Sequence, residues 1–351
     1  MGTPERGTTR PAGESDAERE HRAHLRWVLA ESGEFPDLPG PDRMAPDSVV
    51  PMSGGVDAAT YLVKGESRNV VVKLSRQGLE AEARALRAWR AHSDLVPEVL
   101  GVGTVPSTGD EPVRYLVLEA LSNEWGGVVE TGEDLLEKHP ARARELGRAI
   151  GTELHRLHGA IDLSGFGNFA DLPGSERTYR TWNGYLEDFF RQHTDFVAGL
   201  GIPDDRIDAA CAYIRASPSV AEGRILHGDV TIRNVAVYRY DPITAGLFDP
   251  NPLVGDPSWD IAPMMNNVAF DELRDGDGQS RTLVRDRELL AGFRSSHPGE
   301  IAEETLRSAQ LVQAVLQAEH RRDRVRRGKA DKGVAEAAVE FIRATIEVMA
   351  S

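Results

Sequence analysis

The strongest constraint on the fold is a change in pattern at Leu121. Between residues 49 and 121, segments rich in Val, Leu and Tyr alternate with turn signals such as "SGG" and "KGESRN", which predicts antiparallel strands. The segment "GLEAEARALRAWRAHS" interrupts them with apolar residues at helical spacing, so one helix is expected among the strands. After Leu121, long amphipathic segments such as "ARARELGRAIGTELHRLHGA" predict helices. We therefore expect an α+β fold with a small antiparallel-sheet lobe and a large helical lobe.

Three parts of the chain follow from this pattern. Residues 1–18 are rich in Gly, Pro, Thr and Glu, and we expect a disordered N-terminal arm. Residues 19–121 form the N-terminal lobe, which begins with a helix over "AEREHRAHLRWVLAES". Residues 122–351 form the C-terminal helical lobe, interrupted by two short strands around the loops of residues 225–264.

Composition narrows the function classes. The formal net charge of -15 argues against a nucleic-acid partner and suits a cationic partner, or an anion that arrives with a metal ion. Taken alone, the charge is explained best by solubility. The single cysteine allows no disulfide within the chain, which favours a cytoplasmic location. No run of about 18 apolar residues is present and the N-terminal segment lacks the apolar core of a secretory signal, so no membrane association is expected.

The stretch "ILHGDVTIRNVAVYRYDPITAGLFDPNPLVGDPSWDIAPM" concentrates acids beside predicted strands. Asp229 precedes Asn234 by five residues, and Asp249 follows a second short strand. Asn and Asp supply the oxygen ligands that Mg²⁺ prefers. We expect the loop to present Asp229 and Asn234 separately, so that Asp229 is left to orient or deprotonate a hydroxyl. This division of roles is what phosphoryl transfer requires.

Lys73 lies in the otherwise apolar strand "VVVKLS". It could be an edge lysine that points to water. Alternatively it pairs with Glu80 or Glu82 of the helix that follows at once, because an unpaired ammonium in an apolar strand is costly. The glycine turn "SGGVD" upstream could place backbone N–H groups against a phosphate.

Together these segments resemble the aminoglycoside phosphotransferase family, which are small-molecule kinases with a bilobal, protein-kinase-like fold. The resemblance covers roughly residues 49–262, and it rests mainly on "HGD" with Asn234 and on "FDPNPLVGDPSWDIA". Two departures separate the chain from protein kinases. The glycine turn is not Gly-x-Gly-x-x-Gly, and Pro-Asn-Pro follows Asp249 in place of Phe-Gly, so no activation switch of the protein-kinase kind is expected.

The resemblance implies a role for each matching residue. Asp229 would be the catalytic base or hydroxyl-orienting acid, and Asn234 and Asp249 would bind Mg²⁺. Lys73 would contact the phosphates of ATP, or of another nucleoside triphosphate, and Glu82 matches the family better than Glu80 as its partner. The remaining nucleotide contacts would come from the glycine turn and from the backbone of the hinge: Ser53, Gly54, Gly55, Glu119 and Leu121.

Several other polar residues are expected to do structural work. Asp256 and Asp260 would cap the next helix or hold residues 227–234, which we call the catalytic loop after the role that the resemblance implies. His227 would hydrogen-bond to loop backbone and not act as a base. His155 and His158 lie three residues apart on a predicted helix with no evident third metal ligand nearby, so we expect them to pack or to cap the helix.

We expect the acceptor to be a hydroxyl group of a small molecule. The acidic residues near the site are the evidence for which molecule it is. From residue 246 to residue 278 there are seven acids against one base, Arg274. Five further candidates lie in "TWNGYLEDFFRQHTD": Trp182, Tyr185, Glu187, Asp188 and Asp195. Some of the seven acids have metal or loop roles, and the remainder in "FDELRDGDG" could hold a cationic aminoglycoside or related aminated sugar, as could the five candidates. Both groups could also be an ordinary solvated loop or helix face. A kinase of a sugar, amino alcohol or ketoamine and a catalytically idle pseudokinase remain alternatives, and the oligomeric state stays open.

Overall fold

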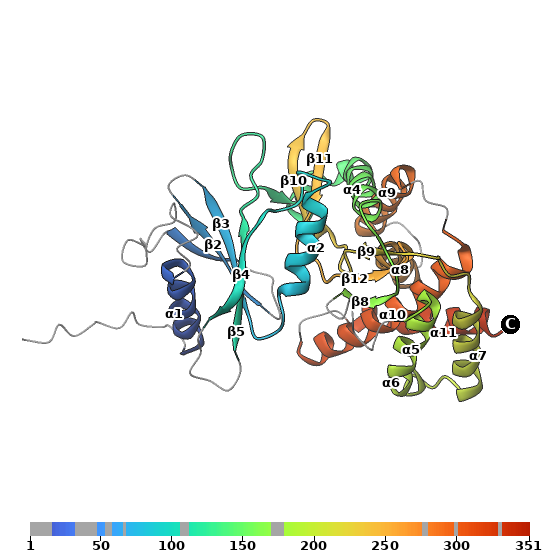
Figure 1. The fold of residues 1–351 in the computed structure, drawn as a ribbon. Helices are drawn as coiled ribbons and strands as arrows, with labels where there is room; N and C mark the ends of the chain where they lie inside the picture. The colour runs from blue at the N-terminus through green and yellow to red at the C-terminus, as the bar shows by residue number, and fades with distance from the viewer. Residues whose placement is uncertain are drawn as a thin grey trace, which may run out of the picture. The chain divides into compact units, whose positions relative to one another are not determined.

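The computed structural model describes residues 16–31, 48–52, 58–65, 68–105, 112–169, 179–275, 280–297, 301–328 and 332–351 (Figure 1). The chain divides into two compact units. The first contains Met1–Ala83 and Glu98–Ala120, and the second contains Arg84–Pro97 and Leu121–Ser351. Most of the expected disordered arm, residues 1–15, lies outside the described residues, while helix α1 (Asp16–Glu31) includes its last three positions. No described helix combines the length and apolar character needed to cross a bilayer.

The first unit is built on a five-stranded antiparallel sheet, as the sequence predicted. Its strands, in the spatial order β1-β2-β3-β5-β4, are β1 (Val49–Met52), β2 (Ala58–Lys64), β3 (Asn69–Ser75), β5 (Val113–Glu119) and β4 (Val99–Val105). Helix α1 packs on one face of this sheet through Leu25 and Val28, which share a core with Val72 and Leu74 of β3 (Figure 1). Because side chains alternate along a strand, Lys73 lies on the opposite face from Leu74.

The second unit is mainly helical. Helix α2 (Glu80–Arg90) runs into it from the first unit. The others are α3 (Gly132–Lys138), α4 (Ala143–His158), α5 (Trp182–Gln192), α6 (Thr194–Ala198), α7 (Asp204–Ala216), α8 (Ser258–Asp275), α9 (Arg281–Ser296), α10 (Glu303–Arg326) and α11 (Lys332–Met349). The helical pattern of "RTWNGYLEDFFRQHTDFVAGL" is divided into two helices, since α5 ends before His193 and α6 begins after it.

Two small sheets frame the polar stretch of residues 225–264. One has the order β11-β10-β6, with β6 (Glu130–Thr131), β10 (Val235–Tyr240) and β11 (Ile243–Leu247). The other has the order β7-β9-β12-β8, with β7 (Asp162–Leu163), β8 (Gly167–Asn168), β9 (Gly223–Leu226) and β12 (Leu253–Gly255). Two strands were expected around this stretch, but β9, β10, β11 and β12 all form there. The short β9 and β12 are buried without an alternating pattern, so periodicity could not mark them.

Helices α4 and α9 pack closely because glycines line their contact (Figure 1). A Cβ on Gly147 would lie 2.0 Å from the carbonyl oxygen of Leu289, and one on Gly292 would lie 2.0 Å from that of Arg144. Such distances are far below van der Waals contact, so any larger residue forces the backbones apart. The contact matters for the site because α4 ends at His158 and α9 leads into His297.

Replacing Gly147 by Ala tests this contact. Alanine gains about 1 kcal/mol of helix propensity, yet the added methyl group must displace the α9 backbone, so we expect a net loss of about 1–3 kcal/mol in unfolding free energy. Chemical denaturation measures it. Thr152→Ala, at an exposed position of the same helix, is the control and should change stability little. A stabilised Gly147→Ala protein would contradict the close contact.

Candidate active site

A buried ion pair joins β3 to α2. The Nζ atom of Lys73 lies 2.5 Å from Oε1 of Glu82, and the two side chains are 8% and 9% exposed. Glu80 instead pairs with Arg114 of β5 and is about half exposed. Positions 80 and 82 are two residues apart, about 200° around a helix, so the two glutamates reach different partners, and only Glu82 meets the buried Lys73. The edge-lysine alternative is wrong, because β3 is the central strand of its sheet.

The backbone N–H groups of the expected hinge, residues 119–121, are partly used in hydrogen bonds within the protein. The N–H of Glu119 donates to the carbonyl of Glu98 at 2.9 Å, and the N–H of Ala120 donates to Asn69 at 3.1 Å. Of the three N–H groups from Glu119 to Leu121, those two are therefore committed to the first unit. The glycine turn with Ser53, Gly54 and Gly55 lies outside the described residues.

Asp229 and Asn234 are brought together by a tight loop between β9 and β10. A short 3₁₀ turn, Ile232–Asn234, places the buried Asn234 so that its Nδ2 donates to the Asp229 carbonyl at 3.0 Å and to Oδ2 of the Asp229 carboxylate at 2.8 Å. We expected the loop to hold the side chains of Asp229 and Asn234 apart, and this was wrong, because they are hydrogen-bonded to each other. Because the Nδ2 group of Asn234 donates to Asp229, its amide oxygen is the side-chain atom that could bind a cation.

Asp249 follows β11 directly beside Asn234. The N–H of Phe248 donates to the Asn234 carbonyl at 3.0 Å, which fixes the chain immediately before Asp249. Asp249 has a φ of 60°, and it is the sole non-glycine residue with positive φ in the described part of the chain. Asp tolerates this left-handed conformation, but it carries a cost, and such strain is concentrated at functional sites.

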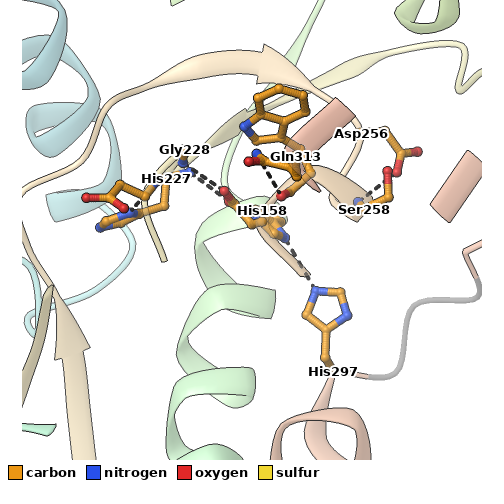
Figure 2. A network of polar contacts seen from close by, with 10 residues as sticks. His158, His227, Gly228, Asp256, Ser258, His297 and Gln313 are labelled. Carbon is orange, nitrogen blue, oxygen red and sulfur yellow. Dashed lines mark hydrogen bonds and ion pairs between the residues drawn. The ribbon is translucent and has the colours of Figure 1, made fainter. Parts of the chain in front are cut away.

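Asp260 holds the backbone of the catalytic loop. One of its carboxylate oxygens accepts the N–H of His227 at 2.7 Å, and the other accepts the N–H of Gly228 at 2.7 Å (Figure 2). Gly228 has a φ of 76°, and a Cβ there would lie 1.9 Å from the Asn251 carbonyl, so only glycine fits. The expectation that Asp260 supports the loop is confirmed. Asp256 accepts the N–H of Ser258 at 2.8 Å, which confirms its capping role at α8.

Histidines complete the support of Asp260. His158 Nε2 lies 2.9 Å from Asp260 Oδ2, and His158 Nδ1 lies 3.4 Å from His297 Nε2 (Figure 2). Burial alone would raise the pKa of Asp260, but the His158 hydrogen bond, the nearby histidines and the Gly228 N–H together lower it. Burial, with His158 and His155 nearby, lowers the pKa of His297 to about 4, so its ring is neutral at neutral pH. The packing role expected of His155 and His158 is confirmed.

His227 connects the catalytic loop to β11. Its Nε2 lies 3.1 Å from the carbonyl oxygen of Phe248, the residue before Asp249, as expected of a backbone-bonding histidine. Its ring is stacked parallel to Trp89 of α2, with centroids 6.1 Å apart. Burial lowers the pKa of the fully buried His227. Sequence reasoning placed Trp89 only in an apolar stripe and did not consider His297. Neither residue has a local signal, because its partners are distant in the chain.

Each described acid of residues 271–275 is ion-paired within the chain. Arg274 lies 3.3 Å from Asp271 and 2.9 Å from Asp275, and Arg287 of α9 lies 2.8 Å from Glu272. Asp277 lies outside the described residues. The described part of this run is therefore an ion-paired helix surface, which favours the structural interpretation over a free anionic surface for a cation.

Most of the candidate acceptor-binding residues on α5 already have partners within the protein or are buried. Arg191 and Arg215 both donate to the carboxylate of Glu187, at 2.9 and 2.7 Å, and Tyr179 donates to Asp188. Trp182 is fully buried, so its ring cannot stack on a bound sugar. The half-buried Tyr185 and the exposed Asp195 remain accessible to solvent.

Comparison with known proteins decides the family. A model of the phosphotransferase enzyme family APH matches residues 48–295, which is most of the chain. The chain belongs to this family. The resemblance seen in the sequence is thus confirmed, and the protein is a small-molecule phosphotransferase with the kinase-like α+β fold that was expected.

Individual relatives are distant. Streptomycin 6-kinase of Streptomyces griseus is 24% identical over 280 residues, which cover 75% of each chain. A structure of a thermostable APH(4)-Ia aminoglycoside phosphotransferase mutant, in ternary complex with AMP-PNP and hygromycin B, is 17% identical with a TM-score of 0.61 and covers 93% of this chain and 97% of that one. An ethanolamine kinase of Plasmodium vivax is 14% identical with a TM-score of 0.54, and the match covers 95% of this chain and 89% of that one.

Asp260→Asn tests the support of the catalytic loop. The amide nitrogen must replace one carboxylate oxygen, so it will face a backbone N–H or the His158 ring, and at least one buried donor loses its acceptor. We expect a loss of about 3–5 kcal/mol in unfolding free energy, the cost of breaking a buried charged network. Denaturant titration measures it. Asp195→Asn, an exposed acid outside the network, is the control. An equally stable Asp260→Asn protein would contradict the anchoring role.

Proposed function

We propose that the protein transfers the γ-phosphoryl group of ATP, or of another nucleoside triphosphate, to a hydroxyl of an aminoglycoside or related aminated sugar. The observation that carries this proposal is the exposed carboxylate of Asp229, held by Asn234 on a loop whose backbone is bonded to the buried Asp260. A carboxylate fixed in this way is suited to orient an acceptor hydroxyl.

Nucleotide binding is assigned to the first unit and the segment that follows it. Lys73, held by Glu82, would contact the phosphates, with backbone N–H groups of Ser53, Gly54 and Gly55 around them. The N–H of Leu121 is the donor proposed for adenine, because those of Glu119 and Ala120 are already bonded. From Glu119 only the carbonyl oxygen is proposed as a contact. The complex of APH(4)-Ia with AMP-PNP supports ATP as the donor.

The residues present fit Mg²⁺. The amide oxygen of Asn234 and the carboxylate of Asp249 are hard oxygen ligands on adjoining segments. The other ligands of the ion would come from phosphates and water, as is usual for Mg²⁺ in phosphoryl-transfer sites. Asn234 and Asp249 would hold the ion, and when bound it would neutralise negative charge that develops on the phosphates.

Asp229 would act on the acceptor. Asn234 donates to its Oδ2, so Oδ1 is the oxygen proposed to accept the hydrogen bond from the acceptor hydroxyl. The acceptor oxygen then forms its bond to the γ-phosphorus as the bond to the bridging β–γ oxygen breaks, and the hydroxyl proton passes to Asp229. Because the transition state is expected to be loose, orientation of the hydroxyl contributes more than early proton removal.

Fewer observations bear on the identity of the acceptor than on the phosphoryl-transfer chemistry. Similarity to streptomycin 6-kinase and the net charge of -15 support a cationic aminoglycoside. The arginine pairing of the acids on α5 and α8 favours a second candidate, the hydroxyl of a less cationic metabolite such as a sugar, amino alcohol or ketoamine. The presence of Lys73, Asp229, Asn234 and Asp249 disfavours an idle pseudokinase.

The proposal extends to setting and biological role. The single Cys211 is buried and unpaired, which suits a reducing cytoplasm. A role in antibiotic resistance follows only if aminoglycosides are the acceptor. An ATP-consumption screen across aminoglycosides, sugars and amino alcohols, with Mg²⁺ present, separates the two candidates. No turnover of any acceptor in this panel would count against both.

The two glutamates of α2 provide a matched pair of variants. Glu82→Gln removes the charge that holds Lys73, so we expect kcat/KM for ATP to fall at least about tenfold, because a lysine aimed at phosphates acts mainly in the transition state. Glu80→Gln removes only the half-exposed partner of Arg114 and should leave kcat/KM within about twofold. Steady-state kinetics with the best acceptor measures both. Equal effects of the two changes would contradict the assignment.

Asp229→Ala separates acceptor chemistry from nucleotide binding. Loss of hydroxyl orientation and proton acceptance should lower kcat by about 10²–10⁴. ATP affinity should stay within about threefold, because Asp229 is proposed to contact no part of the nucleotide. Turnover assays and calorimetric titration of ATP with Mg²⁺ measure the two quantities. Retained turnover would rule out the role, whereas lost ATP binding by a folded variant would move Asp229 to the metal.

A further inference from the structure

The buried acid Glu153 on α4 has no part in the proposed function. Its side chain is 2% exposed, and its Oε1 accepts the hydroxyl of Ser93, which is also buried. Its Oε2 lies 2.8 Å from Nη1 of Arg156, one turn further along α4. Burial raises the pKa of Glu153, and the Ser93 hydroxyl and Arg156 oppose this rise. Because a carboxyl is costly to bury unless its oxygens are hydrogen-bonded, Glu153 and Ser93 join α4 firmly to the segment that follows α2.

Ser93 fixes the start of this segment in both chain directions. Its hydroxyl donates to Glu153 and accepts the N–H of Leu95 at 3.2 Å. Its own N–H donates to the carbonyl of Trp89, in the last turn of α2, at 2.9 Å. All of these residues belong to the second unit. The position of Leu95 therefore depends on the hydroxyl that Glu153 holds.

Leu95 contacts both strands of the β10–β11 hairpin through one carbonyl group. This carbonyl accepts the hydroxyl of Tyr238, on β10, at 3.0 Å. A Cβ added to Gly246, on β11, would lie 2.0 Å from the same oxygen, so the backbone of Leu95 lies directly against that strand. A shift of Leu95 must therefore break the Tyr238 bond or move the hairpin.

The hairpin carries both proposed Mg²⁺ ligands. Asn234 immediately precedes β10, and Asp249 is the second residue after β11. Gly246 is paired with Ala236, which is two residues after Asn234. The contact with Leu95 thus lies near the end of the hairpin where the two ligands stand.

We propose that Glu153 is a positioning residue for the Mg²⁺ site. Through Ser93 and Leu95 it would fix the strands that set the separation of the Asn234 amide oxygen and the Asp249 carboxylate. Mg²⁺ requires near-ideal octahedral geometry, with ligands at about 2.0–2.1 Å, so a small shift of either ligand weakens metal binding. This inference rests on the proposed metal roles of Asn234 and Asp249.

Calorimetric titration of the full chain with AMP-PNP, once with Mg²⁺ and once with EDTA, gives the gain in nucleotide affinity that Mg²⁺ supplies. Ser93→Ala removes the hydroxyl between Glu153 and Leu95, and Glu153→Leu removes its acceptor. We expect each to lower the gain at least about fivefold, less than the roughly 10–100-fold typical of residues that bond a metal ligand directly. Affinity in EDTA should stay within about twofold, because neither residue is proposed to contact the nucleotide. Glu153→Gln keeps an oxygen for the Ser93 hydroxyl and should retain most of the gain.

Ser308→Ala is the matched control for a purely structural effect. Ser308 is fully buried, and its hydroxyl lies 2.8 Å from that of Ser217, away from the hairpin. Its loss should lower stability in denaturant titration, as Ser93→Ala does, and leave the Mg²⁺-dependent gain unchanged. An equal fall of the gain in Ser308→Ala would overturn the positioning role.

Asp249→Asn, measured in parallel, tests the metal assignment itself and should remove most of the gain. If it does so while folded Ser93→Ala keeps the full gain, the positioning role of Glu153 is overturned and the proposed function stands. If neither change lowers the gain, the metal assignment fails, and the role of Glu153 fails with it.

Discussion

The second unit depends on the buried carboxylate of Asp260. An ionised carboxylate is expensive to bury, and it is retained only when its oxygens are hydrogen-bonded. Here two backbone N–H groups of the catalytic loop and the ring of His158 satisfy it. The relation works in both directions, because the same bonds satisfy two buried N–H groups that the tight turn at Gly228 leaves without a regular partner. Loop shape and buried charge therefore stabilise each other.

The supports of Asp260 come from segments far apart in the chain. Asp260 lies near the start of α8, His158 at the end of α4, and His297 after α9. The glycine contact between α4 and α9 brings the two histidines within reach of one another. From the loop, His227 continues the network to Phe248, next to Asp249. A mistake in helix packing would thus reach the catalytic loop through hydrogen bonds that cannot be remade by water in a buried site.

The sequence predicted the parts of this arrangement that have local rules. Strand alternation and helix phase lead to Lys73 and to a glutamate on α2, and the spacing of Asp229, Asn234 and Asp249 indicates a loop and a hairpin end. The sequence pattern could not predict contacts between residues that are far apart in the chain. Trp89 meets His227 across more than a hundred residues, and the acids of α8 are neutralised partly by an arginine on α9. Formal charge counted along a segment therefore overstated the anionic surface available to an acceptor.

The candidate site residues of the second unit fall into a buried group and an exposed group. Asp260, His227 and Asn234 are buried, whereas Asp229 and Asp249 are exposed. Buried groups cannot rearrange without losing hydrogen bonds, so they fix the backbone on which the exposed carboxylates stand. The left-handed backbone at Asp249 fits the same pattern, because a strained residue persists only where its surroundings are rigid. The carboxylates proposed to act on the acceptor and the metal ion stay accessible, and Asp260 and His227, for which no ligand contact is proposed, fix the backbone that carries them.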